Sequence, residues 1–179
     1  MLSGRLQRNY GIDVTLEKYL SQGYYYMLTA SVFNSKYKGG DEIWRNTRYN
    51  SNYAINFLIG KEWQLGKYGR NVFGLNARLS YQGGEHYSPI NLQESQLSED
   101  AIFDETDAFS KQLAPAFTSH FTASYKMNKA RSTHEIAFKI INATMHKEFT
   151  GFQYNYQTHA VDEFREALFV PDLSYKIEF

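Results

Sequence analysis

The sequence predicts an all-β fold of about seven antiparallel strands, and three observations lead to this prediction. Apolar and polar residues alternate in one run after another, no helical periodicity is sustained, and short connections alternate with long ones. The chain has 179 residues, which is enough for one domain, and no linker divides it. We therefore expect residues 1–179 to form one sheet.

Seven runs show the period-two alternation that sends successive side chains to opposite faces of a strand. The predicted strands are 10–20, 24–35, 53–63, 72–82, 117–127, 133–143 and 171–179. All are longer than the about five or six residues of a soluble strand, and close to the about nine to eleven of a tilted membrane-spanning strand. In the clearest run, 72–82, the two predicted faces are Phe73, Leu75, Ala77 and Leu79 on one side and Asn76, Arg78 and Ser80 on the other.

The connections between these runs are sorted by length. Short turns at 21–23, 66–71 and 128–131 alternate with long segments at 36–52, 83–114 and 145–166. Outer-membrane barrels have tight turns at one end and long loops at the other, whereas a soluble up-and-down barrel has no reason to sort its loops. Aromatic residues of the kind that favour a membrane boundary also stand near strand ends: Tyr24, Tyr26, Tyr53, Trp63 and Tyr81. The predicted fold class is therefore an antiparallel transmembrane β-barrel segment.

Seven strands do not make a complete barrel of this kind. Bacterial single-chain barrels have an even number of strands, and their short turns lie on the periplasmic side. If run 171–179 ends on the short-turn side, run 10–20 begins on the long-loop side. We therefore expect an incomplete barrel, an open and curved sheet whose earlier strands lie outside residues 1–179.

Composition argues against several other classes. The formal net charge is zero, so a nucleic-acid partner is not expected. The absence of cysteine excludes disulfides, thiolate metal sites and a cysteine nucleophile. No window approaches the ~20 consecutive apolar residues of a membrane helix. Residues 1–11 lack the apolar core of a signal peptide, so an export signal is expected upstream if the protein is exported.

Residues 11–63 resemble the late barrel strands of TonB-dependent outer-membrane receptors of the Bacteroidetes type. The runs NVFGLNARLSYQGGEHYSPIN, STHEIAFKIINATM and FVPDLSYKIEF are similar to the segments that follow in that family. The likeness extends in order over nearly all 179 residues. It implies the C-terminal third of a barrel of about 22 strands, with the plug domain, the TonB-contacting segment and the earlier strands outside this sequence.

The resemblance also implies a function and partners. Receptors of this family import scarce nutrients, such as metal chelates, cobalamin or glycans, with energy from TonB. The implied location is the cell outer membrane of a Gram-negative bacterium. The implied partners are outer-membrane lipid, the barrel-assembly machinery, and the plug domain and TonB of the full-length receptor. The closing strand resembles the family's barrel-insertion signal, which falls on Leu173, Tyr175, Ile177 and Phe179.

One loop offers candidates for binding a ligand. Trp44, Arg45, Arg48 and Tyr49 suit stacking on a sugar ring or holding an anion. Packing between loops, with the arginines paired to Asp41 or Glu42, is the simpler interpretation. The acidic residues of the loop at 99–107 lack EF-hand spacing, so a solvated charge run is favoured over a Ca²⁺ site.

Motifs for catalysis are missing from the sequence. The five histidines are scattered, and HEIAF at 134–138 lacks the second His of the zinc-hydrolase motif. No serine stands in a GxSxG elbow. We therefore expect no enzyme activity, no metal and no cofactor.

Charged residues within the strands are expected on the face turned away from lipid, where they would meet water or a plug. They are Arg78, Lys126, Glu135 and Lys139. A lysine or arginine on the lipid face would cost about 2–4 kcal/mol at mid-depth. Two other interpretations stay open: a soluble β-barrel or sandwich module with an aromatic ligand cavity, and a structural or adhesive surface protein. A requirement for detergent would separate the membrane barrel from the soluble module.

Overall fold

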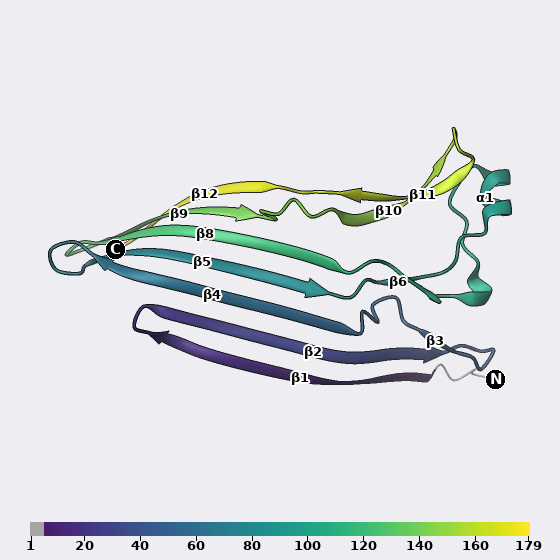
Figure 1. The fold of residues 1–179 in the computed structure, drawn as a ribbon, viewed down its shortest axis with the longest axis horizontal. Coiled ribbons are helices and arrows are strands. Elements are labelled where there is room, and N and C mark those ends of the chain that lie inside the picture. The colour runs from purple at the N-terminus through teal and green to yellow at the C-terminus, as the bar shows by residue number, and fades with distance from the viewer. Residues whose placement is uncertain (1–5) are drawn as a thin grey trace.

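Seven antiparallel strands, each hydrogen-bonded to the next, make up one open sheet in the computed structural model, which describes residues 6–179 (Figure 1). The order across the sheet is β1–β2–β4–β5–β8–β9–β12, and the short β3 also pairs with β2. The bounds are β1 (Leu6–Ser21), β2 (Tyr24–Lys38), β3 (Trp44–Asn46), β4 (Tyr53–Leu65), β5 (Asn71–Gln82), β8 (Ala116–Asn128), β9 (Thr133–Ile141) and β12 (Val170–Glu178). The predicted all-β antiparallel fold is confirmed.

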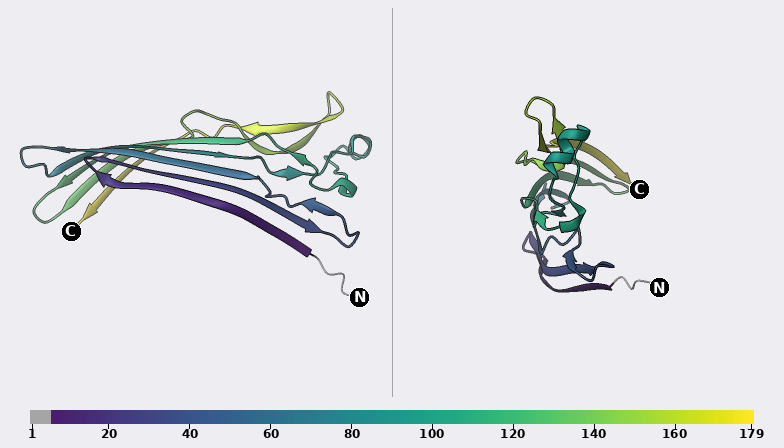
Figure 2. Two further views of the ribbon diagram at one scale, coloured as in Figure 1. Left: turned by 60° about the horizontal axis from the view of Figure 1, so that its bottom comes forward. Right: turned by 90° about the vertical axis from the view of Figure 1, so that its right-hand side faces the viewer.

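The sheet is curved and does not close into a barrel (Figure 2). Strands β1 and β12 form its two edges, and within residues 6–179 neither pairs with the other. Seven strands in alternating direction leave the two edge strands running the same way, so pairing them would require a parallel contact in an otherwise antiparallel sheet. The expectation of an open sheet is confirmed.

All seven predicted strands are present, with adjusted ends. Strand β1 starts at Leu6 and β2 continues to Lys38, because the two strands stay in register up to the Leu6–Lys38 pair. Strand β9 ends at Ile141, two residues before the predicted end. The reason is Asn142, which has a φ of 52° and whose side chain bonds both the N–H and the carbonyl of His146.

The sorting of connections by length is confirmed: the tight turns lie at one end of the sheet and the long connectors at the other (Figure 1). Gln22 and Gly23 form a two-residue turn between the register partners Ser21 and Tyr24, with φ of 54° and 79°. Positive φ at both positions suits the right-handed twist of the flanking strands. The turn after β8 is closed by the Lys129 N–H, which donates to the Ser132 carbonyl at 2.8 Å.

The long connectors contain structure of their own. They form two small two-stranded sheets, β6 (His86–Tyr87) with β7 (Lys111–Gln112) and β10 (Glu148–Asn155) with β11 (Ala160–Glu166), neither of which was predicted. The acidic stretch 93–109 overlaps a short helix, α1 (Leu92–Ser98), which is capped by the Asn91 side chain and followed by a 3-10 turn at Glu105–Asp107. Glycine allows the connectors to cross closely, because a Cβ at Gly84 would overlap the Leu113 carbonyl oxygen.

Burial is concentrated in these connectors, not on the sheet. Among residues 6–179 the buried apolar side chains are Ala108, Leu113 and Tyr154, and all three lie in the connectors. The accessible surface is 12737 Å², whereas a compact 20.8 kDa monomer would expose roughly 8,900 Å². The sheet therefore lacks the packed core that normally stabilises a β-protein in water.

The Asn50 side chain links the first long connector to β2 by hydrogen bonds. Its side chain is fully buried, Oδ1 accepts from the Ser35 N–H at 2.8 Å, and Nδ2 donates to Asn46 Oδ1 at 3.0 Å. We expect Asn50→Ala to cost about 1–3 kcal/mol of unfolding free energy, because it leaves the Ser35 N–H without a partner. Denaturant unfolding and hydrogen exchange at the Ser35 amide measure this. Asn9→Ala, which removes an exposed bond to the Ser35 hydroxyl, is the control; equal losses in the two variants would refute the role of Asn50.

Candidate functional site

One face of the sheet is apolar across all seven strands. Residues that are direct partners across neighbouring strands share a face, so the register identifies this surface. A single row across the sheet contains Val14, Ala30, Ile55, Tyr81 and Phe117, and another contains Ile59, Ala77, Phe121 and Ile140. The side chains are exposed: Ile12 by 73%, Phe121 by 46% and Leu173 by 74%. A monomer in water rarely leaves so large an apolar surface uncovered.

The opposite face is polar. Asn76, Arg78 and Ser80 alternate with Leu75, Ala77 and Leu79, as predicted, since Arg78 pairs with His120 whereas Leu79 pairs with Ser119. Lys126, Glu135 and Lys139 lie on the polar face as well. Lys126 and Glu135 are register partners and form an ion pair of 3.4 Å. The predicted separation of charged residues from the apolar face is confirmed for all four.

Aromatic residues flank the apolar face at both ends. Tyr53 and Tyr81 pair at the loop end, with ring centroids 5.6 Å apart, and Trp63 stacks on Phe73 near the turn end at 5.7 Å. On β4 the two levels are ten residues apart, at Tyr53 and Trp63. Ten residues span ~33 Å along a strand, which projects to ~25 Å when the strand is tilted by about 40°. That height equals the apolar band of an outer-membrane barrel, about 25 Å.

Three of the four residues of the predicted insertion signal lie on this apolar face. Leu173, Tyr175 and Ile177 pair with Phe138, Ile136 and His134 of β9, and the Tyr175 hydroxyl lies 2.7 Å from His134 Nδ1. Phe179 follows β12 and is 98% exposed. The alternation therefore brings the three strand residues to one face, on the outer edge of the sheet.

The four loop candidates are divided between different surroundings. Trp44 lines a small hollow with Arg8, whereas Arg48 lines a basin on the polar side. Arg45 forms an ion pair of 2.6 Å with Asp41, as the packing interpretation expects, and also bonds the Thr106 carbonyl. Arg48 pairs with Glu85 at 2.8 Å, and its guanidinium lies 5.6 Å from the centroid of the exposed Tyr49 ring. The four loop candidates are therefore not gathered around one shared ligand site.

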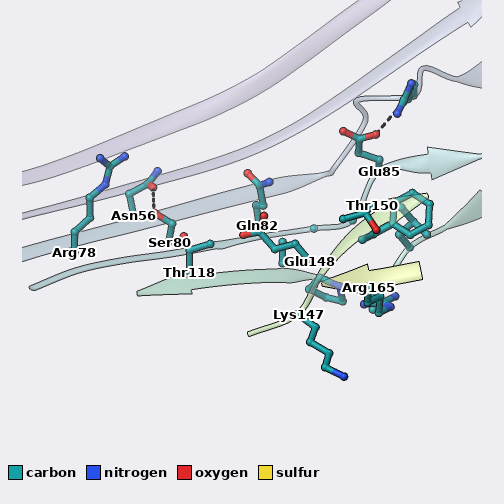
Figure 3. A pocket seen from close by; sticks show the side chains of 18 residues that line it. Asn56, Arg78, Ser80, Gln82, Glu85, Thr118, Lys147, Glu148, Thr150 and Arg165 are labelled. Atoms are coloured by element: carbon teal, nitrogen blue, oxygen red, sulfur yellow. Dashed lines mark hydrogen bonds and ion pairs between the residues drawn. The ribbon is translucent and has the colours of Figure 1, made fainter. Parts of the chain in front are cut away.

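A polar basin of about 490 Å³ opens where the polar face meets the long connectors (Figure 3). Its strand residues include Asn56, Arg78, Ser80, Gln82 and Thr118, and its connector residues include Arg48, Glu85, Glu148 and Arg165. The Ser80 hydroxyl donates to Asn56 Oδ1 at 2.7 Å. Arg78 forms no ion pair within residues 6–179. The basin has the size of a small-ligand site and offers hydrogen-bonding groups from both the sheet and the connectors.

Sequence reasoning missed an aromatic cluster formed by two of the long connectors. Phe152 lies at its centre, with ring centroids 4.8 Å from Tyr87, 5.6 Å from Phe103 and 4.9 Å from Phe149. The cluster borders a hollow of about 370 Å³ that adjoins the polar basin through Arg48 and Glu85. No short-range pattern reveals it, because Tyr87 and Phe152 are far apart in the chain.

Two carboxyl groups of the acidic loop bond to neighbouring residues of the chain. Within residues 6–179 no group of three or more His, Cys, Asp or Glu side chains is placed to hold an ion. Asp104 instead accepts from the N–H and hydroxyl of Thr106, and these bonds lower the pKa of its carboxyl. The Asp100 carboxyl accepts from the N–H of Ala101 at 2.7 Å.

We expect His86 to make the stability of the connectors depend on pH. Burial lowers its pKa below the ordinary 6.5; the Asn50 carbonyl opposes this shift and the charge of Lys36 adds to it. The unfolded chain then takes up a proton near pH 6.5 while the folded connector does not. The stabilisation is complete above pH 6.5 and is lost as the pH falls from about 6.5 towards the folded pKa. We expect hydrogen-exchange protection of the His86 amide, which donates to the Arg48 carbonyl at 2.8 Å, to fall in that window.

His86→Gln is the control for this effect, because glutamine keeps a polar side chain but does not titrate. The protection factor at residue 86 should then be flat from pH 7.5 to below pH 6, after correction for the intrinsic exchange rate. The same pH dependence in both proteins would show that another group is responsible.

No protein-family model, curated protein or solved structure matches this chain. Among residues 6–179 no helix has the length and apolarity that crossing a membrane requires. The assignment of a function therefore depends on the two faces of the sheet and on the connectors.

Proposed function

We propose that residues 1–179 form part of the barrel wall of a TonB-dependent receptor in the outer membrane of a Gram-negative bacterium. The receptor takes up a nutrient with energy from TonB, and this part of it is not an enzyme. The proposal depends mainly on the apolar face, which extends across all seven strands, with Lys18, Lys61 and Ser119 as polar positions within it, and ends in aromatic residues at both levels. Its height agrees with the hydrocarbon layer that it would span.

The two faces then have different solvents. Lipid covers the apolar face, while Arg78, Lys126, Glu135 and Lys139 point to a wet interior that the receptor's plug domain occupies. The connectors at the other end of the strands from the tight turns face outside, and the polar basin beneath them is a place for the nutrient or for the plug. The resemblance of the sequence favours a metal chelate, cobalamin or a glycan as the nutrient.

The free edges of β1 and β12 require additional strands in a membrane. Their outward N–H and C=O groups have no partner in hydrocarbon, and each such group would cost several kcal/mol there. A closed barrel with antiparallel pairing at both edges needs an odd number of further strands beside these seven, which gives the even total of bacterial barrels. The barrel-assembly machinery would join them, reading β12 with Leu173, Tyr175, Ile177 and Phe179.

The proposal is tested by asking which solvent the chain needs. The 179-residue chain, produced alone, is expected to aggregate in buffer and to become dispersed, with its strand content retained, in detergent micelles or lipid vesicles. Light scattering and circular dichroism measure the two properties. A monodisperse, closed monomer in detergent-free buffer would contradict the proposal and favour the soluble ligand-binding module.

A further inference from the structure

Beyond the loop-end aromatic level, the apolar side of the sheet carries a basic patch made of Arg8, Lys36 and Lys38, with Tyr10 and Trp44 beside them. Arg8 and Lys36 are direct register partners on β1 and β2, and Lys38 pairs with Trp44 of β3. Arg8 and Tyr10 continue the alternation of Ile12 and Val14, so the patch lies on the same side as the apolar face. It is not on the side of the polar basin.

The patch surrounds a hollow of about 250 Å³, lined by Arg8, Tyr10, Lys36 and Trp44. The Arg8 guanidinium lies 5.4 Å from the centroid of the Tyr10 ring. Lys38 is paired with Glu42 at 3.5 Å, but Arg8 and Lys36 form no ion pair within residues 6–179. Two like charges directly opposite each other destabilise a sheet, and an anion in the hollow would offset their repulsion.

The depth of the patch relative to the apolar face limits what that anion can be. Val32 pairs with Tyr53 at the loop-end aromatic level, and Lys36 lies four residues further along β2. Four residues rise ~13 Å along the strand, or ~10 Å along the normal for a tilt of about 40°. If lipid covers the apolar face, Lys36 and Arg8 stand in the layer of polar headgroups, which lies just outside the hydrocarbon. Tyr and Trp rings are also favoured at this boundary.

We infer that this patch binds the phosphate of an anionic lipid headgroup in the leaflet on the loop side of the sheet. The inference rests on the proposed function, because only a bilayer against the apolar face brings a headgroup to this position. Arg8 would supply a planar pair of donors and Lys36 a point charge, while Trp44 and Tyr10 pack against the glycerol region and the upper acyl chains.

Trp44 allows a direct test, because the sequence contains only two tryptophans. In the Trp63→Phe variant, which keeps the aromatic contact with Phe73, all tryptophan emission comes from the patch. The full chain is reconstituted into phosphatidylcholine vesicles that contain a minor fraction of phosphatidic acid. Bromine, which quenches tryptophan at short range, is placed on the acyl chains of either the phosphatidic acid or the same fraction of the phosphatidylcholine.

Brominated phosphatidic acid is expected to quench Trp44 far more than brominated phosphatidylcholine. Each of the two cations should enrich phosphatidic acid beside Trp44 on the order of fivefold. In the double variant Arg8→Gln with Lys36→Gln, the two brominated lipids should quench Trp44 equally. Lys67→Gln with Arg70→Gln removes the same charge in the tight turn between β4 and β5 and should keep the preference. Added inorganic phosphate should not compete, because the lipid is held by the bilayer as well.

The outcomes separate the inference from the proposed function. Equal quenching by the two lipids in the parent protein would overturn the headgroup site while leaving the chain in the membrane. Loss of the preference on adding inorganic phosphate would assign the site to a free anion and overturn the lipid assignment. Absence of quenching by either lipid, both at Trp44 and at Trp63 in a Trp44→Phe variant, would overturn the proposed function itself.

Discussion

Phe121→Arg is expected to lower the stability of the folded chain in detergent or lipid by about 2–4 kcal/mol, the cost of a cation at the middle of the bilayer on the lipid face of a barrel. Phe121 lies midway on β8 between Phe117 and Tyr125, the aromatic residues at the two levels of this strand. Its side chain is 46% exposed on the apolar face and lies in one row with Ala77 and Ile140. Chemical unfolding in micelles or vesicles gives the free energy.

Two control variants separate charge from simple loss of packing at this position. Phe121→Leu keeps the apolar contact with lipid and should cost much less than the arginine. Ser124→Arg places the same cation on the same strand but on the polar face, between the small residues Gly74 and Ala137, and should be well tolerated. Similar losses for Phe121→Arg and Ser124→Arg would show that the two faces of the sheet do not have different solvents.

Deletion of Ser174 is expected to abolish assembly of the receptor that contains this chain. Side chains alternate along a strand, so removal of one residue sends Tyr175, Ile177 and Phe179 to the face opposite Leu173. The apolar side chains of the final strand would then divide between the two solvents, and Lys176 and Glu178 would be turned to lipid. The amount of folded receptor in outer-membrane fractions measures the effect, and the failed protein should accumulate in the periplasm or be degraded.

The effect of this deletion can be compared with that of point substitutions in the same strand. Phe179→Ser removes a ring that would contribute well over ~1 kcal/mol at the bilayer boundary, so its loss of folded receptor should be large but smaller than that of the deletion. Lys176→Gln, which breaks an exposed ion pair of 2.5 Å with Glu178, should leave the level near that of the parent. Equal levels for the Phe179 and Lys176 variants would show that β12 is an ordinary edge strand.

Residue alternation in the sequence was enough to predict the seven strands, their antiparallel class and the face of each side chain. Arg78 and Leu79 occur on opposite faces as expected, because a period of two leaves no other arrangement in a regular strand. Turn chemistry was equally local: Gln22 and Gly23 adopt the positive φ that a two-residue hairpin requires. The open edges also follow from the sequence, since an odd number of antiparallel strands leaves the first and last running in parallel.

The connectors depended on tertiary contacts that no short pattern encodes. The β6–β7 pair and the Tyr87–Phe152 contact join segments many residues apart, and they require close crossings such as Gly84 against the Leu113 carbonyl. Trp44 pairs with Lys38 of β2 whereas Arg48 bonds Glu85, so the two line different hollows although they are near neighbours in the chain. Alternation determines a side chain's face from its own strand alone, whereas a loop contact depends on which distant backbone comes close enough to bond. Only the tertiary structure could decide which loop contacts form. It also brought Arg8 beside Lys36, because the register of β1 on β2 pairs two cations that lie 28 residues apart in the chain.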